Sequence, residues 1–255
     1  MLLLYCPVLN VWPSAITHKA ELKLDSAYQE RRGEIEHYFD RTAAEAWKRL
    51  TSDAPVSRIR ATVRAGRDRM RDLLLSWLPA DLNGKRLLDA GCGTGALAVE
   101  AARCGARVLA IDVAPTLIQI ARERIPQDLA PGEIDFRAGD MLDPALGEFD
   151  YVVAMDSLIH YRPQEVLRVL SGLAARTSGS IVFTFAPKTG PLTLMHVVGR
   201  LFPRGNRAPA IEPVGEDTLK ALILAEPSLA NWQVGRCERI VSGFYTSQAL
   251  ELIRK

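Results

Sequence analysis

Residues 87–95 have the sequence Leu-Leu-Asp-Ala-Gly-Cys-Gly-Thr-Gly, and this stretch decides the fold class. Its two leucines and Ala90 form a short, mostly apolar run after Lys85 and Arg86, which predicts a short buried strand. Three glycines follow, and glycine permits the sharp turn by which such a strand enters a helix. Backbone N–H groups at the start of that helix are able to approach a ligand. The stretch therefore predicts a strand, a loop that contacts a nucleotide-like cofactor, and a helix.

The chain after residue 84 continues this alternation of strand and helix. Apolar runs predict strands at 85–91, 107–112, 134–138, 149–155 and 180–186, and amphipathic stretches predict helices at 94–104, 115–125, 163–176 and 215–225, with a shorter piece at 142–146. Two β-rich runs at 232–241 and 244–252 are joined by Ser242-Gly243, which favours an antiparallel hairpin. The predicted fold class is α/β, with a doubly wound, Rossmann-like, mostly parallel sheet and an antiparallel C-terminal strand.

The segments around the sheet are expected to differ from it. Apolar residues at helical spacing predict an N-terminal helical arm over 34–80, with one helix at 34–50 and a second that ends at Pro79. Residues 1–33 have no such pattern, so we expect a poorly ordered extension or, as an alternative, a segment that contacts lipid or another chain. The main domain then spans 81–255 and includes a lid or substrate insertion at 187–213.

Composition excludes several classes of protein. The chain has 255 residues, of which 48% are hydrophobic, enough for one sizeable core. Its net charge of +2 is too small to indicate a nucleic-acid partner. The four cysteines form no C-x-x-C pair and the four histidines lack zinc-ligand spacing, so we expect neither a disulfide framework nor a metal site. A reducing, cytoplasmic environment fits this pattern best.

Asp89 favours one cofactor over another. Gly91, Gly93 and Ala96 also satisfy the relaxed glycine pattern of dinucleotide-binding enzymes, so the glycines alone do not select the cofactor. A carboxylate beside the loop repels a pyrophosphate, but it attracts the ammonium and sulfonium groups of S-adenosylmethionine (SAM). SAM is therefore the expected cofactor, and its expected contacts in this stretch are Asp89, Gly91, Cys92, Gly93 and Gly95.

Two later strand ends offer further contacts to SAM. Asp112 ends the second predicted strand, where its two oxygens are suited to bind both ribose hydroxyls. After the third strand, Asp140 offers a carboxylate and Met141 an apolar face for adenine. The alternative for both acids is that they cap the helices that follow. Val113 and Met155, which also follow strands, complete the expected cofactor contacts.

These three segments closely resemble the motifs of class I SAM-dependent methyltransferases. A narrower resemblance, to the magnesium-protoporphyrin IX O-methyltransferase family of chlorophyll and bacteriochlorophyll synthesis, rests on residues 37–40 (HYFD), 89–95 (DAGCGTG), 156–161 (DSLIHY), 185–189 (FAPKT) and 201–203 (LFP). It covers roughly residues 34–253 and does not include residues 1–30.

The resemblance implies a reaction and its setting. It implies transfer of the SAM methyl group to one propionate of magnesium protoporphyrin IX, which gives the monomethyl ester. It further implies that the porphyrin-binding subunit of magnesium chelatase hands over the substrate, and that the protein contacts the photosynthetic membrane peripherally. A methyltransferase acting on a quinone precursor, or a non-catalytic carrier of SAM and porphyrin, is an alternative.

Six residues are expected on the substrate side. The resemblance places Tyr38 and Phe39 over the porphyrin, with Tyr38 positioning the reacting propionate, and ordinary helix packing is the alternative for Tyr38. His160 follows the fourth predicted strand, and the unperturbed pKa of a histidine, near 6.5, suits it to orient the nucleophile or take its proton. Magnesium ligation or simple bracing of the loop are its other possible roles. Tyr161, Lys188 and Phe202 are the remaining expected contacts, of which the last two lie in an apolar segment that carries basic residues.

The second arm helix carries six arginines whose role the sequence leaves open. We expect them to form a solvated face, with substrate docking or an anionic membrane surface as alternatives. These residues are Arg58, Arg60, Arg64, Arg67, Arg69 and Arg71.

Overall fold

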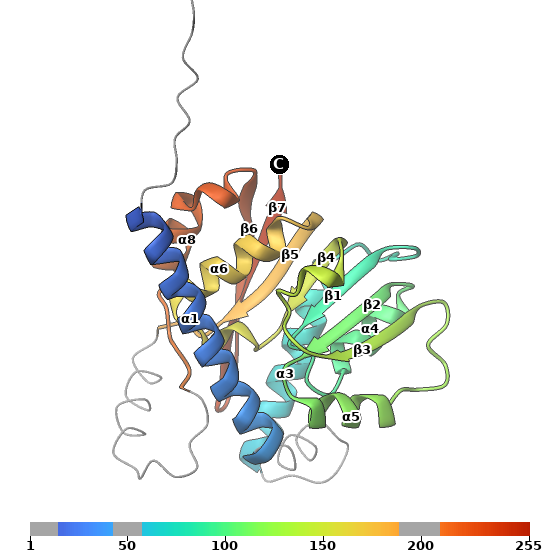
Figure 1. Cartoon of the computed structure of the whole chain (residues 1–255). Coiled ribbons are helices and arrows are strands. Elements are labelled where there is room, and N and C mark those ends of the chain that lie inside the picture. The colour runs from blue at the N-terminus through green and yellow to red at the C-terminus, as the bar shows by residue number, and fades with distance from the viewer. Residues whose placement is uncertain (1–14, 43–57, 189–209) are drawn as a thin grey trace, which may run out of the picture.

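A computed structural model of the chain describes residues 15–42, 58–188 and 210–255 (Figure 1). At its centre is a seven-stranded sheet with the strand order β3-β2-β1-β4-β5-β7-β6. The strands are β1 (Arg86–Ala90), β2 (Arg107–Asp112), β3 (Glu133–Ala138), β4 (Phe149–Ala154), β5 (Thr177–Phe185), β6 (Trp232–Ser242) and β7 (Tyr245–Arg254). The first five strands pair in parallel, and β7 pairs antiparallel with both of its neighbours. The predicted fold class is confirmed.

The sheet is buried on both faces because apolar residues occupy consecutive positions in its central strands. Leu88 and Val152 pack on one face, against α6 (Pro163–Ala174) and α8 (Glu216–Ala225). Leu87 and Val153 point to the opposite face, against α4 (Ala96–Arg103) and α5 (Pro115–Glu123). Side chains alternate along a strand, so an unbroken apolar run supplies both cores. The helices predicted between the strands are all present, and residues 144–146 form a short 3-10 helix.

Two helices that precede the sheet cover it from opposite sides (Figure 1). Helix α3 (Arg58–Ser76) packs through Met70 and Leu74 on the same face as α4. Helix α1 (Ala15–His37) packs through Tyr28 and Ile35 on the face that α6 covers. The helical arm therefore closes over both faces at one end of the sheet.

The structure corrects the expected N-terminal boundary. Helix α1 begins at Ala15, so the expectation of an unstructured extension up to residue 33 is wrong for residues 15–33. Tyr28, inside that range, is fully buried. A helix was expected at 34–50. In the structure α1 ends at His37, and one π-helical turn, η1 (Tyr38–Thr42), follows it. Residues 43–50 lie outside the described residues, as do residues 1–14 and most of the predicted insertion.

Candidate active site

A cavity of about 370 Å³ lies at the C-terminal ends of β1, β2 and β4, where α1 and α3 approach the sheet. This is the edge at which open α/β sheets bind their ligands. Of the residues expected at the site, the cavity wall includes Asp89, Gly91, Cys92, Gly93, Asp112, Val113, Met141, Met155, Phe39, His160 and Tyr161. These predicted residues therefore lie around one cavity, and their contacts with ligands stay predictions.

The glycine loop has the shape that its sequence indicates. Gly91 and Gly93 have φ values of 82° and 55°, in the left-handed region that glycine adopts without strain. A Cβ atom on Gly91 would lie 2.3 Å from the Cβ of Ser157, so only glycine fits there, whereas the space beside Gly93 is open. Gly95 has another role: a Cβ there would lie 2.6 Å from the Phe136 ring, and the residue does not line the cavity. Gly95 allows α4 to pack closely.

Asp89 is a buried carboxylate at the inner end of the cavity. It is 1% exposed, and its Oδ2 has no hydrogen-bond partner among the described residues. Burial, with the nearby Asp112 carboxylate as a second cause, raises the pKa of Asp89 to about 7. An unpaired buried carboxylate is costly, so this position favours a cationic ligand.

Asp112 braces the loop while it faces the cavity. Its Oδ2 accepts a hydrogen bond from the Gly93 N–H (2.8 Å), and its Oδ1 accepts one from the Ala114 N–H (2.9 Å) at the start of α5. Asp112 therefore also binds the backbone at the start of α5, as the capping alternative expects. Burial raises the pKa of Asp112 despite these hydrogen bonds. Burial also raises the pKa of the Cys92 thiol well above its ordinary value, which keeps it protonated and a poor nucleophile.

Asp140 points away from the cavity, toward α1. Its Oδ1 accepts hydrogen bonds from the Tyr28 hydroxyl (2.6 Å) and the Leu142 N–H (2.9 Å), and its Oδ2 pairs with Arg32 (3.1 Å). The carboxylate does not line the cavity, whereas its neighbours Gly139 and Met141 do. In this structure Asp140 anchors α1, and its expected contact with the cofactor stays a prediction.

The substrate-side residues divide into two groups. His160 is 8% exposed and lies edge-on to the Phe39 ring at 5.7 Å, and Tyr161 stacks on Tyr28 at 5.5 Å. Tyr38 contacts the Phe39 ring edge-on at 5.1 Å but does not line the cavity. Burial raises the pKa of Tyr38. Asp40 ties this turn to α5, because its Oδ1 accepts hydrogen bonds from the N–H and hydroxyl of Thr116 (2.9 and 2.5 Å).

Of the two remaining expected substrate contacts, Lys188 does not line the cavity. Lys188 is exposed, and its N–H donates to the carbonyl of Val214 (3.0 Å), next to the bridge between Pro187 and Val214 at the base of the insertion. Phe202 lies outside the described residues.

Helix α3 supplies a part of the wall that the sequence did not predict. Arg64, Arg67, Asp68 and Arg71 line the cavity, so the expected solvated face is wrong for three of the six arginines. The spacing was the available signal, because positions three and four apart share one side of a helix. Asp156, in the segment that follows the fourth strand, also lines the cavity.

Comparisons with known proteins agree with this site. Residues 87–177 match a methyltransferase domain, and residues 154–254 match the magnesium-protoporphyrin IX methyltransferase C-terminus. The magnesium-protoporphyrin O-methyltransferase of Rhodobacter capsulatus is 52% identical over 229 residues, which are 89% of this chain and 99% of the relative. The chain belongs to the magnesium-protoporphyrin O-methyltransferase family.

Two solved structures of a similar protein contain SAM or SAH. The magnesium protoporphyrin IX methyltransferase of Synechocystis PCC 6803 with bound SAH has a TM-score of 0.75 and 28% identity, covering 87% of this chain and 98% of that one. A second structure of that protein has bound SAM and a TM-score of 0.73. A ubiquinone biosynthesis O-methyltransferase of Xanthomonas oryzae is 36% identical, but over only 49% of this chain and 55% of the relative. The cofactor of the fold family is therefore SAM.

Proposed function

We propose that the protein transfers a methyl group from SAM to one propionate of magnesium protoporphyrin IX, forming the monomethyl ester. The observation that carries this proposal is the distribution of charge in one cavity. The buried carboxylate of Asp89 and the neighbouring Asp112 form one part of its wall. The arginines of α3 form another part, where Arg67 and Arg71 pair with Asp156 and Asp68. The first group suits a cationic donor and the second an anionic acceptor.

The inner end of the cavity fits SAM. The unpaired Oδ2 of Asp89 is suited to the ammonium group, and the open face of Gly93 allows the ligand to approach the backbone. Asp112, Val113 and Met141 line the same cavity, and in our proposal they bind the ribose and the adenine. When bound, SAM supplies a methyl group on a positively charged sulfur.

The acceptor requires positioning more than activation. A propionate resembles a glutamate side chain, whose pKa of about 4.3 leaves it ionised near pH 7. Holding the reacting atoms in line contributes about 7–11 kcal/mol to lowering the barrier. Removing the carboxylate from water raises its pKa, so a neighbouring group that orients it or takes its proton assists the reaction. His160 has this role in our proposal, with Tyr38, Phe39 and Tyr161 positioning the ring and with Lys188 and Phe202 as further substrate contacts.

The deciding experiment is incubation of the purified protein with SAM and magnesium protoporphyrin IX, followed by mass spectrometry of the pigment. The expected product carries one added methyl group. Methylation of a quinone precursor, with none of the porphyrin, would favour the quinone-acting alternative. Tight binding of both ligands without turnover would favour a carrier.

We also propose that the protein receives its substrate from the porphyrin-binding subunit of magnesium chelatase and contacts the membrane peripherally. Among the described residues, no helix is both long and apolar enough to cross a bilayer. Ile59, Val241 and Phe244 are 53–63% exposed, and Arg58 and Arg60 are exposed beside Ile59. The turn between β6 and β7 contacts α3, since the Ser242 hydroxyl donates to the carbonyl of Thr62 (2.9 Å). We expect the protein to cosediment with anionic vesicles, and we expect Phe244→Ser to weaken this binding. If the wild-type protein does not cosediment, the proposed membrane contact is wrong.

A further inference from the structure

Asp156 has a backbone conformation that its residue type rarely adopts. It lies two residues after β4, and its φ is 53°. In the part of the chain that the structure describes, it is the only residue other than glycine with a positive φ. Aspartate tolerates this region better than most residues, but glycine adopts it at no cost. A side chain kept in such a position points to a role for that side chain.

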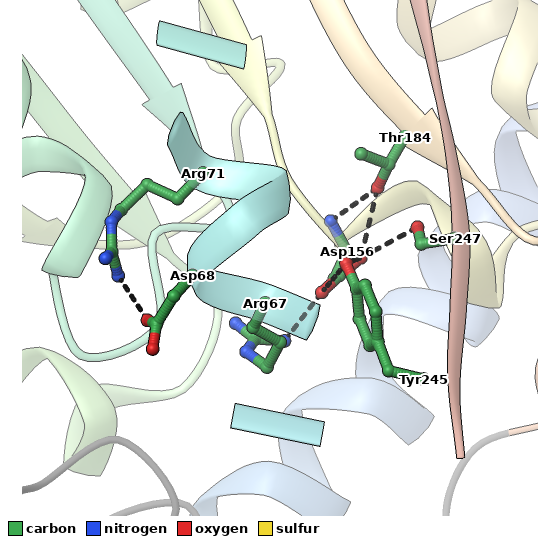
Figure 2. Close-up of polar contacts among 7 residues, drawn as sticks. All are labelled: Arg67, Asp68, Arg71, Asp156, Thr184, Tyr245 and Ser247. Atoms are coloured by element: carbon green, nitrogen blue, oxygen red, sulfur yellow. Dashed lines mark hydrogen bonds and ion pairs between the residues drawn. The ribbon is translucent and has the colours of Figure 1, made fainter. Parts of the chain in front are cut away.

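The carboxylate of Asp156 is the centre of a nearly buried hydrogen-bond network (Figure 2). Its side chain is 7% exposed, and its Oδ2 pairs with Nη1 of Arg67 at 2.7 Å. The Tyr245 hydroxyl donates to the carboxylate at 3.1 Å, and the Ser247 hydroxyl does so at the same distance. Thr184 lies 3.3 Å away through Oγ1, which also accepts a hydrogen bond from the Asp156 N–H (2.7 Å).

These contacts join three separate parts of the molecule. Arg67 comes from α3, Thr184 from β5, and Tyr245 and Ser247 from β7. Helix α3 lies directly on β7 at this point, because a Cβ atom on Gly66 would lie 2.5 Å from the Tyr245 ring. The network therefore fixes the α3 wall of the cavity relative to the end of the sheet.

The charged residues of α3 form two kinds of ion pair, one within the helix and one with the loop after β4. Asp68, the adjacent carboxylate, pairs with Arg71 at 2.9 Å on its own helix (Figure 2). Arg67 instead reaches across to Asp156, 89 positions along the chain. Because both residues of this pair line the cavity, the ion pair connects the α3 wall to the loop after β4.

The loop held in this way also contacts the cofactor segment and carries the candidate catalytic histidine. The Ser157 hydroxyl donates to the carbonyl of Ala90 (2.8 Å), and the Cβ of Ser157 lies against Gly91. His160 follows in a single 3-10 turn, Leu158–His160. A shift of Asp156 would move both Ser157 and His160.

We propose that Asp156 is a positioning residue for methyl transfer: its network with Arg67, Thr184, Tyr245 and Ser247 sets the separation between the α3 wall and the loop that carries His160. The inference rests on the proposed function, because α3 and this loop form the acceptor side of the cavity. A purely structural turn would be served by glycine, without burying a carboxylate. Methyl transfer is sensitive to such a separation, since small displacements of reacting groups cost large factors in rate.

The test compares kcat, the Kd for SAM and thermal stability in four variants. Asp156→Ala removes every acceptor and lowers kcat at least about tenfold, while the Kd for SAM stays within about threefold. Asp156→Asn keeps kcat within about threefold of wild type, because asparagine tolerates positive φ and its amide can pair with Arg67 and the hydroxyls. Tyr245→Phe removes a hydroxyl outside the cavity wall and lowers kcat about threefold. Tyr151→Phe, on β4 and outside the network, is the matched control and leaves kcat unchanged.

A double variant separates positioning from simple destabilisation. If both residues act through one network, Asp156→Ala with Tyr245→Phe has a kcat no lower than Asp156→Ala alone. Wild-type kcat in the folded Asp156→Ala protein would overturn the inference, as would an Asp156→Asn variant as slow as Asp156→Ala. An inactive wild type would overturn the proposed function itself, whereas an active wild type with unaffected variants overturns only the role of Asp156.

Discussion

The buried carboxylate of Asp89 makes SAM affinity depend on pH. Without cofactor, burial and the Asp112 carboxylate raise the pKa of Asp89 to about 7. Only the ionised form attracts the cationic groups of SAM, so protons compete with the cofactor below this pKa. The ionised fractions of one group with a pKa of about 7 predict an affinity about eightfold higher at pH 7.5 than at about pH 6.

Asp89→Asn removes this charge at constant size and has opposite effects on binding and stability. SAM binding weakens by at least about tenfold at neutral pH and loses its pH dependence, since a charged hydrogen bond is worth about 1.5–3 kcal/mol. The folded pKa lies above the unfolded value of 3.8, so the wild type without SAM loses stability as pH rises from about 4 to 7. That loss is at most about 4 kcal/mol, and the buried amide of the variant costs about 1–3 kcal/mol. We therefore expect the variant without cofactor to be more stable above pH 7.

Two measurements check this prediction. Calorimetric titration with SAM across this pH range gives the affinities, and thermal unfolding without SAM gives the stabilities. Asp135→Asn, at an exposed position of β3, is the matched control and changes neither. A wild-type affinity that is flat with pH, or the same slope in Asp89→Asn, would refute the assignment of Asp89 to the cationic end of SAM.

Substitutions at three further positions test other parts of the site. Asp112→Ala weakens SAM binding at least about tenfold in calorimetry by removing two acceptor oxygens, and unchanged affinity in a folded variant would place the ribose elsewhere. Tyr28→Phe removes the hydrogen bond to Asp140 and lowers the free energy of unfolding by about 1 kcal/mol, measured by denaturant titration; an unchanged value contradicts this. His160→Ala lowers kcat at least about tenfold with little change in SAM affinity, and His160→Asn restores part of it; turnover within about threefold of wild type excludes a catalytic role.

The sequence predicted the sheet well because burial leaves a strong local pattern. Strand β2 occupies the same residues, 107–112, that its apolar run indicates. Strands buried on both faces need continuous apolar sequence, and the turns between them need glycine or proline. The cofactor side was predictable for the same reason, because Asp89 and the glycines are fixed to a strand end.

Helix α1 was missed because its packing leaves little periodicity. Between residues 24 and 41, where its side chains and those of the following turn are described, only Tyr28 and Ile35 are buried. Two apolar contacts seven positions apart do not produce the repeated spacing by which a helix is recognised. The hydrogen bond from Tyr28 to Asp140 spans 112 positions, so no local pattern contains it.

The direction of individual acidic side chains was not predictable either. Asp112 and Asp140 both follow strand ends, yet one faces the cavity and the other faces α1. The difference depends on Tyr28 and Arg32, which approach Asp140 only after α1 has packed. The direction of the Asp156 side chain was unpredictable for the same reason. Its partner Arg67 lies on α3, and the sequence did not determine where α3 packs.

The two charged parts of the cavity differ in exposure, and this difference predicts how salt affects the two substrates. Asp89 is 1% exposed, whereas the side chains of Arg67 and Arg71 are 23% and 22% exposed. Salt screens exposed charges strongly and buried charges weakly, with a Debye length of about 10 Å at 0.1 M and about 3 Å at 1 M. Raising the salt from about 0.05 to about 0.5 M should therefore increase the KM for the porphyrin severalfold and leave the Kd for SAM within about twofold.

Steady-state kinetics and calorimetry at matched pH measure the two constants separately. Arg71→Gln should reduce the salt dependence of the porphyrin KM, because it removes one of the screened positive charges and leaves the Asp68 carboxylate without this partner. Arg103→Gln, on the exposed side of α4, is the control and should leave that dependence unchanged. A KM that is insensitive to salt, with a SAM Kd that rises instead, would mean that the arginines of α3 do not attract the acceptor and that the cationic cofactor is held by exposed groups.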